Sequence, residues 1–212
     1  MIKTIIFDLD GTLLNTLEDL KDATNFALSE FGYPGRSLEE IRCFVGNGVR
    51  KLIERAVPEN CENIDECLCV FKQNYSKNMC RHTAPYDGIL KILSDIKAEG
   101  IKIGVVSNKF DSAVKELCKK YFGNLVDTAI GQSDDVPKKP APDGVFKAMK
   151  ELGADKNSTI YAGDSDVDVQ TAKNASLPCI GVTWGFRDKK DLEGADFIID
   201  TPCDIIKTIR SL

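Results

Sequence analysis

Two aspartates separated by a single leucine follow the first apolar run of the chain. The run 5–7, Ile-Ile-Phe, leads into Asp8, Leu9 and Asp10, and Gly11 then lets the chain turn. Alternate residues of an extended segment lie on the same side, so Asp8 and Asp10 are expected to face one way and Leu9 the other. One carboxylate can act as a nucleophile while the other donates and accepts a proton. The alternative is an ordinary Asp-Gly turn whose carboxylates are solvated.

Further polar residues follow two later apolar runs. Ser107 and Asn108 come directly after the run 102–106, and the segment 163–168, Gly-Asp-Ser-Asp-Val-Asp, follows another run. Between them the segment 138–140, Lys-Lys-Pro, lies in a proline-containing loop. Each segment alone could be a helix cap, a polar turn or a solvated loop. In a parallel sheet, however, ligands bind beyond the carboxyl ends of the strands, so these groups are expected to meet at one edge.

Carboxylates, a hydroxyl, an amide and a cation at one edge are suited to a hard metal ion and a phosphate. A carboxylate that attacks a phosphate dianion meets like-charge repulsion. Mg²⁺ bound by Asp8 and Asp164 would screen that repulsion and orient the phosphoryl group. A lysine would neutralise the phosphoryl oxygens in the transition state, and the Ser107 hydroxyl would hold them.

The elements that would position these residues alternate between strands and helices. Helical patterns separate the apolar runs, with Asp111 and Asp143 as expected caps of two helices and Gly100 as the stop signal of a helix that opens near Asp87. Such alternation predicts a parallel sheet with helices on both faces, an α/β fold. The predicted strands are Thr4–Phe7, Lys102–Val106, Leu125–Ile130, Thr159–Ala162, Cys179–Thr183 and Phe197–Ile199.

Residues 16–84 interrupt this alternation, because their pattern is helical throughout. Glycines and prolines separate the segments. The sequence therefore predicts an α/β core of residues 1–15 and 85–212, with an inserted all-helical cap domain of residues 16–84. The four predicted helices are Glu18–Phe31, Leu38–Phe44, Gly48–Ala56 and Ile64–Met79.

The composition is that of a globular protein of mild acidity. The chain has 212 residues, 42% of them hydrophobic, and 28 Lys and Arg against 33 Asp and Glu leave a net charge of −5. This charge argues against a general nucleic-acid binder. No apolar run approaches the ~20 residues of a membrane span, and the start of the chain lacks the apolar core of a signal peptide. We therefore expect a cytoplasmic protein that binds neither membrane nor nucleic acid.

The eight cysteines are scattered and include no Cys-x-x-Cys pair, which favours reduced thiols. Four of them, Cys61, Cys67, Cys69 and Cys80, lie near His82, the only histidine. A zinc site there is one interpretation, but the irregular spacing favours small buried apolar side chains.

The segments Asp-Leu-Asp-Gly-Thr, Ser-Asn, Lys-Lys-Pro-Ala-Pro and Gly-Asp-Ser-Asp-Val-Asp, in this order, resemble the haloacid dehalogenase superfamily of phosphohydrolases over the whole chain. The resemblance implies a Rossmann-like parallel sheet core with a helical cap of the C1 type. It also implies Mg²⁺ as the cofactor and a phospho-aspartate intermediate. The implied roles are nucleophile for Asp8, general acid and base for Asp10, phosphate binding for Gly11, Ser107, Asn108 and Lys139, metal binding for Asp8, Asp164 and the Asp10 carbonyl, and support for Ser165 and Asp168.

Three further segments are similar to phosphoglycolate phosphatase-like members of that superfamily: Phe-Val-Gly-Asn-Gly-Val-Arg at 44–50, Tyr-Asp-Gly at 86–88 and Gly-Val-Thr-Trp-Gly-Phe at 181–186. This implies a phosphomonoesterase for a small phosphorylated metabolite, with substrate specificity set by Gly46, Asn47, Gly48 and Arg50. The two glycines could instead mark helix ends, and Arg50 could be solvated.

Several alternatives remain open at this point. A phosphomutase of the β-phosphoglucomutase type would form the same phospho-aspartate, and a pyrophosphatase or nucleotidase of the same superfamily would use the same motifs. A receiver domain also carries aspartates, a hydroxyl and a lysine on a parallel sheet, but it lacks a helical insert. Asp166 competes with Asp168 for the supporting role, and the chain could be a monomer or a homodimer.

Overall fold

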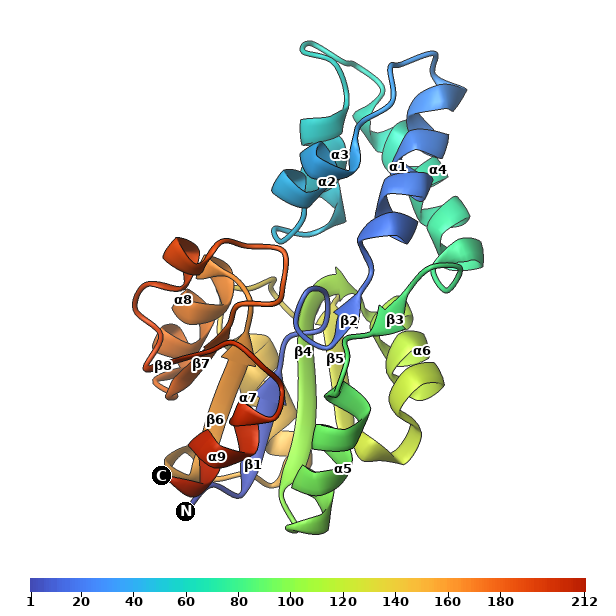
Figure 1. Cartoon of the computed structure of the whole chain (residues 1–212). Coiled ribbons are helices and arrows are strands. Elements are labelled where there is room, and N and C mark those ends of the chain that lie inside the picture. Colours follow the sequence, from blue (N-terminus) through green and yellow to red (C-terminus); the bar gives the residue numbers. More distant parts are fainter.

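Six parallel strands form the centre of the larger part of the molecule in this computed structural model, which describes all 212 residues (Figure 1). Their order in the sheet is β5-β4-β1-β6-β7-β8. The central strand β1 pairs with β4 on one side and with β6 on the other. The strands are β1 Thr4–Phe7, β4 Lys102–Phe110, β5 Thr128–Gln132, β6 Thr159–Gly163, β7 Cys179–Val182 and β8 Phe197–Ile199. The parallel α/β sheet predicted from the sequence is confirmed.

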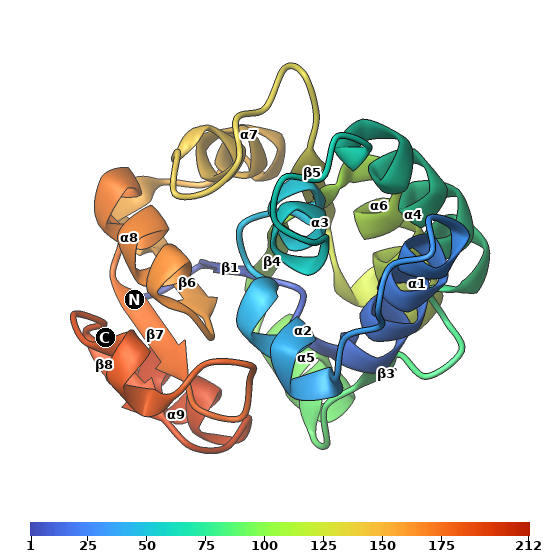
Figure 2. The same cartoon turned by 90° about the horizontal axis from the view of Figure 1, so that it is seen from above.

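Helices cover both faces of this sheet. Ile5 and Phe7 of β1 pack in the apolar cluster beneath α5 Ile89–Ala98, α6 Asp111–Phe122 and α9 Asp204–Arg210. Ile6 points to the other face, where α7 Asp143–Leu152 and α8 Asp166–Ala175 lie. Viewed from above, the two sets of helices lie on opposite sides of the strands (Figure 2). None of the helices is long and apolar enough to cross a membrane.

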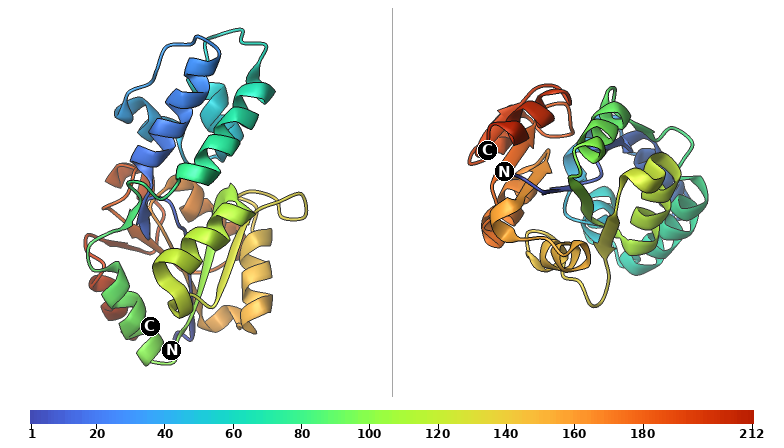
Figure 3. Two further views of the ribbon diagram at one scale, coloured as in Figure 1. Left: turned by 90° about the vertical axis from the view of Figure 1, so that its right-hand side faces the viewer. Right: turned by 90° about the horizontal axis from the view of Figure 1, so that it is seen from below.

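Four helices form a separate group above the carboxyl ends of the strands, which we call the helical unit (Figures 1 and 3). The chain enters and leaves it through an antiparallel ribbon, β2 Leu14–Asn15 and β3 Ala84–Pro85. Both termini lie at the opposite end of the molecule (Figure 3). The helices are α1 Leu17–Glu30, α2 Leu38–Phe44, α3 Val49–Ala56 and α4 Ile64–Asn78, within one residue of the predicted bounds.

Three predicted details differ from the structure. Strand β5 begins at Thr128 rather than at residue 125, because residues 123–125 form a 3-10 turn; two more such turns span 156–158 and 189–192. Asp111 and Asp143 do not cap helices, since each is the first helical residue and neither makes a cap hydrogen bond. Asp111 instead accepts a hydrogen bond from the Gly131 N–H, at 3.0 Å. Strand β4 continues to Phe110 after a shift of register beyond Val106.

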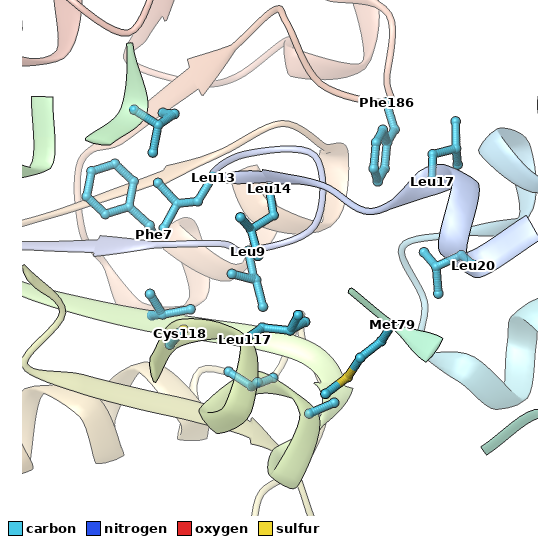
Figure 4. Close-up of a cluster of buried hydrophobic side chains, with 14 of the residues drawn as sticks. Phe7, Leu9, Leu13, Leu14, Leu17, Leu20, Met79, Leu117, Cys118 and Phe186 are labelled. Atoms are coloured by element: carbon cyan, nitrogen blue, oxygen red, sulfur yellow. The ribbon is translucent and has the colours of Figure 1, made fainter. Parts of the chain in front are cut away.

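The base of the helical unit shares one apolar cluster with the sheet (Figure 4). Leu9, the residue between the two aspartates, is fully buried there beside Leu117 of α6, and Met79 reaches the same cluster from the end of α4. Burial of Leu9 on this side leaves the opposite side of the segment to the aspartates, as the alternation predicts. The helical unit is thus anchored beside the residues that could do chemistry.

Tyr75 of α4 provides a test of this packing. Its ring stacks on Phe71, with centroids 5.5 Å apart, and its hydroxyl is the one buried side-chain polar atom without a hydrogen-bond partner. An unpaired buried hydroxyl costs about 1–3 kcal/mol. We therefore expect Tyr75→Phe to leave the free energy of unfolding unchanged or to raise it by about 1 kcal/mol, measured by urea denaturation.

Tyr161→Phe is the matched control, because the Tyr161 hydroxyl is equally buried but donates to Asp168 and accepts from Lys139. This control should lose about 1–3 kcal/mol. A loss of similar size in Tyr75→Phe would contradict the assignment of an unpaired hydroxyl.

Candidate active site

A small cavity of about 50 Å³ lies between the carboxyl ends of the strands and the helical unit. Asp8 follows the last residue of β1, and its N–H continues the pairing with β6 by donating to the Ala162 carbonyl at 2.9 Å. Asp8, Asp10, Ser107, Lys139 and Asp164 all line the cavity. The structure therefore brings together residues that the sequence places more than 150 positions apart.

Lys139 is the cation at the centre of this site. Its ammonium donates to Asp8 Oδ1 at 2.6 Å, to Asp168 Oδ1 at 2.7 Å and to the Tyr161 hydroxyl at 3.1 Å. Burial alone would lower the pKa of Lys139, but the adjacent Asp168 and Asp8 carboxylates raise it well above its usual range. Lys139 is therefore a fixed positive charge in contact with Asp8.

Three buried carboxylates, those of Asp8, Asp164 and Asp168, place oxygen atoms within 4.8 Å of one another. Burial raises the pKa of Asp8 well above its usual range, against the opposing effect of Lys139. Burial and the Asp168 charge raise the pKa of Asp164 to about 7. Such crowding penalises the ionised carboxylates until a cation joins them. The cluster is therefore suited to a hard divalent metal ion.

Two glycines make room for Asp164. A side chain at Gly11, whose φ is +93°, or at Gly185 would collide with the Asp164 carboxylate. The Phe186 N–H then donates to Asp164 Oδ2 at 2.7 Å and orients it. The prediction that Gly11 binds phosphate is not supported, because its N–H already donates to the Leu14 carbonyl at 2.9 Å. Gly11 instead leaves room for the Asp164 carboxylate.

Only one of the two acids in the first turn of α8 faces the carboxylate cluster. Ser165 and Asp168 form a capping box at its start, and Asp168 also accepts from Lys139. Asp166 is exposed to solvent and contributes no contact to the cluster. The capping box places the carboxylate of Asp168, not that of Asp166, against the site.

Asp10 lies beside the carboxylate cluster and has its own cation. Both of its carboxylate oxygens are 2.8 Å from Lys109 Nζ, and Oδ1 also accepts from the Thr16 hydroxyl at 2.6 Å. The carbonyl oxygen of Asp10 accepts no hydrogen bond. Lys109 was not among the predicted site residues, although it directly follows Ser107 and Asn108 and so belongs to the same strand end.

Ser107 and Asn108, both predicted to bind phosphate, differ in whether their side chains are free to donate a hydrogen bond to it. The Ser107 hydroxyl lines the cavity and donates to no protein acceptor. Asn108 is not free, because its amide donates to the carbonyls of Gly46 and Lys139, both at 3.1 Å, and accepts from the Lys139 N–H at 2.6 Å. Ser107 thus remains a candidate phosphate ligand, whereas the Asn108 side chain ties the lysine loop to the helical unit.

The loop between α2 and α3 forms the roof of the cavity, and Gly46 and Gly48 both line it. Gly48 is also the N-cap of α3, so the interpretation of the glycines as helix ends holds for this residue. The side chain of Asn47 instead accepts from Arg55 at 2.8 Å. For Arg50 the sequence left two interpretations, a substrate contact or a solvated position, and the structure agrees with the second: its half-exposed side chain pairs with Asp65 and Glu54 outside the cavity. A position on the outer face of α3 accounts for this orientation.

The cysteines near His82 do not form a metal cluster, since the three aspartates are the only such group in the structure. All eight cysteines are free, and burial raises the pKa of Cys67 to about 11. The interpretation of small buried apolar side chains therefore holds for Cys67, whereas Cys61 and Cys80 are half-buried and Cys69 is exposed.

The chain is similar to known proteins over most of its length. Residues 5–182 match a family model described as haloacid dehalogenase-like hydrolase. Phosphoglycolate phosphatase of Aquifex aeolicus is 31% identical over 97% of this chain and 96% of its own length. A candidate phosphoglycolate phosphatase of Lactobacillus delbrueckii subsp. bulgaricus has a TM-score of 0.91 at 33% identity, covering 98% of both chains. A predicted phosphoglycolate phosphatase of Haemophilus somnus has a TM-score of 0.90 at 28% identity, covering 98% of this chain and 97% of its own.

The raised pKa of Asp164 predicts how stability without a metal ion depends on pH. Between about pH 4 and pH 7 the folded protein holds a proton on Asp164 that the unfolded chain has lost, so this group's contribution to stability falls as pH rises through that window. In EDTA, we expect the free energy of unfolding of Asp164→Asn to rise relative to that of the wild type between pH 5 and pH 8, by on the order of 2–4 kcal/mol.

Thermal unfolding at several pH values measures this difference. A divalent cation, added as MgCl₂ or MnCl₂ at pH 8, should raise the Tm of the wild type more than that of Asp164→Asn. Parallel curves of Tm against pH for the two proteins would show that Asp164 does not carry the raised pKa.

Proposed function

The chain belongs to the family of haloacid dehalogenase-like hydrolases and is a phosphatase for a small phosphorylated substrate, and we propose that it is a Mg²⁺-dependent phosphoglycolate phosphatase. The observation that carries this proposal is the position of Asp8. Its buried carboxylate faces the cavity, 2.6 Å from the Lys139 ammonium and within the cluster of three carboxylates.

In the proposed reaction, Asp8 attacks the phosphorus atom and the bond from phosphorus to the ester oxygen breaks, which leaves an aspartyl phosphate. Asp10 leaves its contact with Lys109, takes up a proton from solvent and gives it to the departing oxygen. Asp10 then takes a proton from water, the water attacks phosphorus, and inorganic phosphate leaves while Asp8 is restored. Lys139 and the Ser107 hydroxyl hold the phosphoryl oxygens during both steps.

Mg²⁺ fits the residues present. Asp8, Asp164 and the Asp10 carbonyl would hold it, since two of the three oxygens belong to the crowded cluster and the third accepts no hydrogen bond. When bound, it supplies positive charge that screens the substrate from Asp8. Asp168 supports this arrangement through Lys139 and Ser165 rather than by contact with phosphate.

Residues 16–84 act as a cap in this proposal, on a core of residues 1–15 and 85–212. The cap loop is held over the site by core side chains: Asn108 donates to the Gly46 carbonyl at 3.1 Å, and Lys138 donates to the Asn47 carbonyl at 3.4 Å. The cavity is small and partly walled by the cap, so substrate entry requires these contacts to open. A closed cap keeps bulk water away from the aspartyl phosphate.

The identity of the substrate rests on two observations. The relatives compared above are described as phosphoglycolate phosphatases, and the small cavity suits a compact ester. Eight free cysteines support a cytoplasmic protein, and a net charge of −5 argues against a general nucleic-acid binder.

Removal of the nucleophile tests the mechanism. We expect Asp8→Asn to reduce phosphate release from phosphoglycolate to background, because no carboxylate oxygen remains to form the aspartyl phosphate. EDTA should abolish activity in the wild type, and added Mg²⁺ should restore it. Asp166→Asn is the control, since it changes an exposed acid of α8 and should keep activity. Substantial turnover by Asp8→Asn would refute the assignment of the nucleophile.

A panel of phosphorylated compounds tests the substrate. We expect kcat/KM to be higher for phosphoglycolate than for glucose 6-phosphate, AMP or pyrophosphate, by at least about 10-fold, because the cavity is small and its roof is close. Phosphate release and isomerisation of β-glucose 1-phosphate are measured in parallel. Isomerisation faster than phosphate release would identify a mutase, and a preference for AMP or pyrophosphate would identify a nucleotidase or pyrophosphatase.

A further inference from the structure

Three cations line the cavity, and two of them are occupied by carboxylates. Lys139 pairs with Asp8 and Asp168, and Lys109 pairs with both oxygens of Asp10. The third is Arg187, which follows Phe186 in the connection between β7 and β8. No carboxylate lies within ion-pair distance of Arg187. The site therefore contains one cation that makes no ion pair with the protein, although its charge acts from a greater distance to lower the pKa of Asp164.

Arg187 is nonetheless held firmly. One Nη donates to the Arg42 carbonyl at 2.8 Å, and the other donates to the Val45 carbonyl. Both acceptors are neutral, so the contacts fix the orientation of the guanidinium without neutralising it. A guanidinium has five N–H donors in one plane, and only two of these are used. An oriented cation with free donors at a cavity wall is prepared for an anion.

The surroundings of Arg187 determine which part of a substrate it could meet. The phosphoryl group belongs on the floor of the cavity, beside Asp8 and Lys139. The remainder of the ester extends toward the roof, where Val45, Val49 and Leu52 provide aliphatic contacts. Gly46 leaves space beside the guanidinium, since a Cβ there would lie 3.1 Å from Arg187 Nη2. Arg187 is thus the polar group available at the far end of the ester.

We propose that Arg187 binds the carboxylate of the substrate's leaving group and so selects phosphate esters that carry a carboxylate. This rests on the proposed function and names the residue that makes the distinction. An arginine can bind a carboxylate through two parallel N–H···O bonds. A substrate without a carboxylate leaves the guanidinium unmatched in a closed cavity, which weakens its transition state relative to that of the acid.

The alternative is that Arg187 has a purely structural role. Another residue, Arg42, has a similar structural role without facing the cavity, so it can serve as a control. Arg42 of α2 makes the reciprocal contact: its Nε donates to the Phe186 carbonyl at 2.7 Å, and its Nη2 donates to Asp188 at 3.2 Å. The two arginines thus connect the same two segments, residues 42–45 and 186–188; we call these contacts the clasp. Arg42 does not line the cavity, so it shares the clasp with Arg187 without access to the substrate.

The test compares phosphoglycolate with 2-hydroxyethyl phosphate, in which a hydroxymethyl group replaces the carboxylate. The values of kcat/KM for both esters are measured with the wild type, Arg187→Met and Arg42→Met. We expect Arg187→Met to lower the value for phosphoglycolate roughly 10- to 100-fold more than that for 2-hydroxyethyl phosphate, the factor expected for a hydrogen bond to a charged group. Arg42→Met should lower both values alike and keep the wild-type ratio.

The ratio of the two values within one preparation does not depend on how much of the protein is folded. Arg187→Lys keeps the charge but lacks the planar fork, so it should retain part of the preference for phosphoglycolate. If Arg187→Met keeps the wild-type ratio, as Arg42→Met should, Arg187 is only part of the clasp and the inference is overturned. If the wild type itself shows no preference for phosphoglycolate, the proposed substrate fails as well.

Discussion

The charge balance between Lys139 and the buried aspartates is the constraint on which the rest of the site depends. Ionised carboxylates cannot be packed together in a buried site unless cations compensate them. Lys139 lies between Asp8 and Asp168 and compensates part of this charge. Asn108 accepts from the Lys139 N–H, and the Tyr161 hydroxyl accepts from its ammonium. Asp164 has no comparable partner, and its raised pKa marks the place where a divalent cation would complete the balance.

The topology of the sheet explains why one short segment, residues 8–10, lies beside so many of the site residues. Strand β1 lies in the middle, so its carboxyl end has β4 on one side and β6 on the other. Ser107 comes from β4, and Asp164 follows directly after β6. The helical unit enters through the ribbon that follows the Asp8 segment, so the same turn that presents the aspartates also sets the position of the roof. A single displacement of this turn would alter both the nucleophile and the cover of the cavity.

The sequence predicted the strands and their polar ends because both depend on local patterns. Apolar runs identify β1, β4 and β6, and parallel strands necessarily share an edge. What escaped prediction depends on contacts between distant segments. Nothing near Asn108 indicates that its amide is used by Gly46 and Lys139. Nothing near Gly185 indicates that it makes room for Asp164. The sequence left Arg50 either at the site or in solvent, because only the position of α3 decides which way its side chain faces, and the structure turns it outward.

The way in which the helical unit is held over the site affects the charge available inside it. The α2–α3 loop offers backbone carbonyls to Asn108, Lys138 and Arg187, not carboxylates. Carbonyl acceptors fix the position of a cation but leave its net charge intact, whereas a carboxylate in the loop would cancel it. The loop can therefore close the cavity and still leave Arg187 able to attract an anion. Closure through neutral groups therefore gives the cavity a firmly held cover and keeps the guanidinium of Arg187 free of an ion pair.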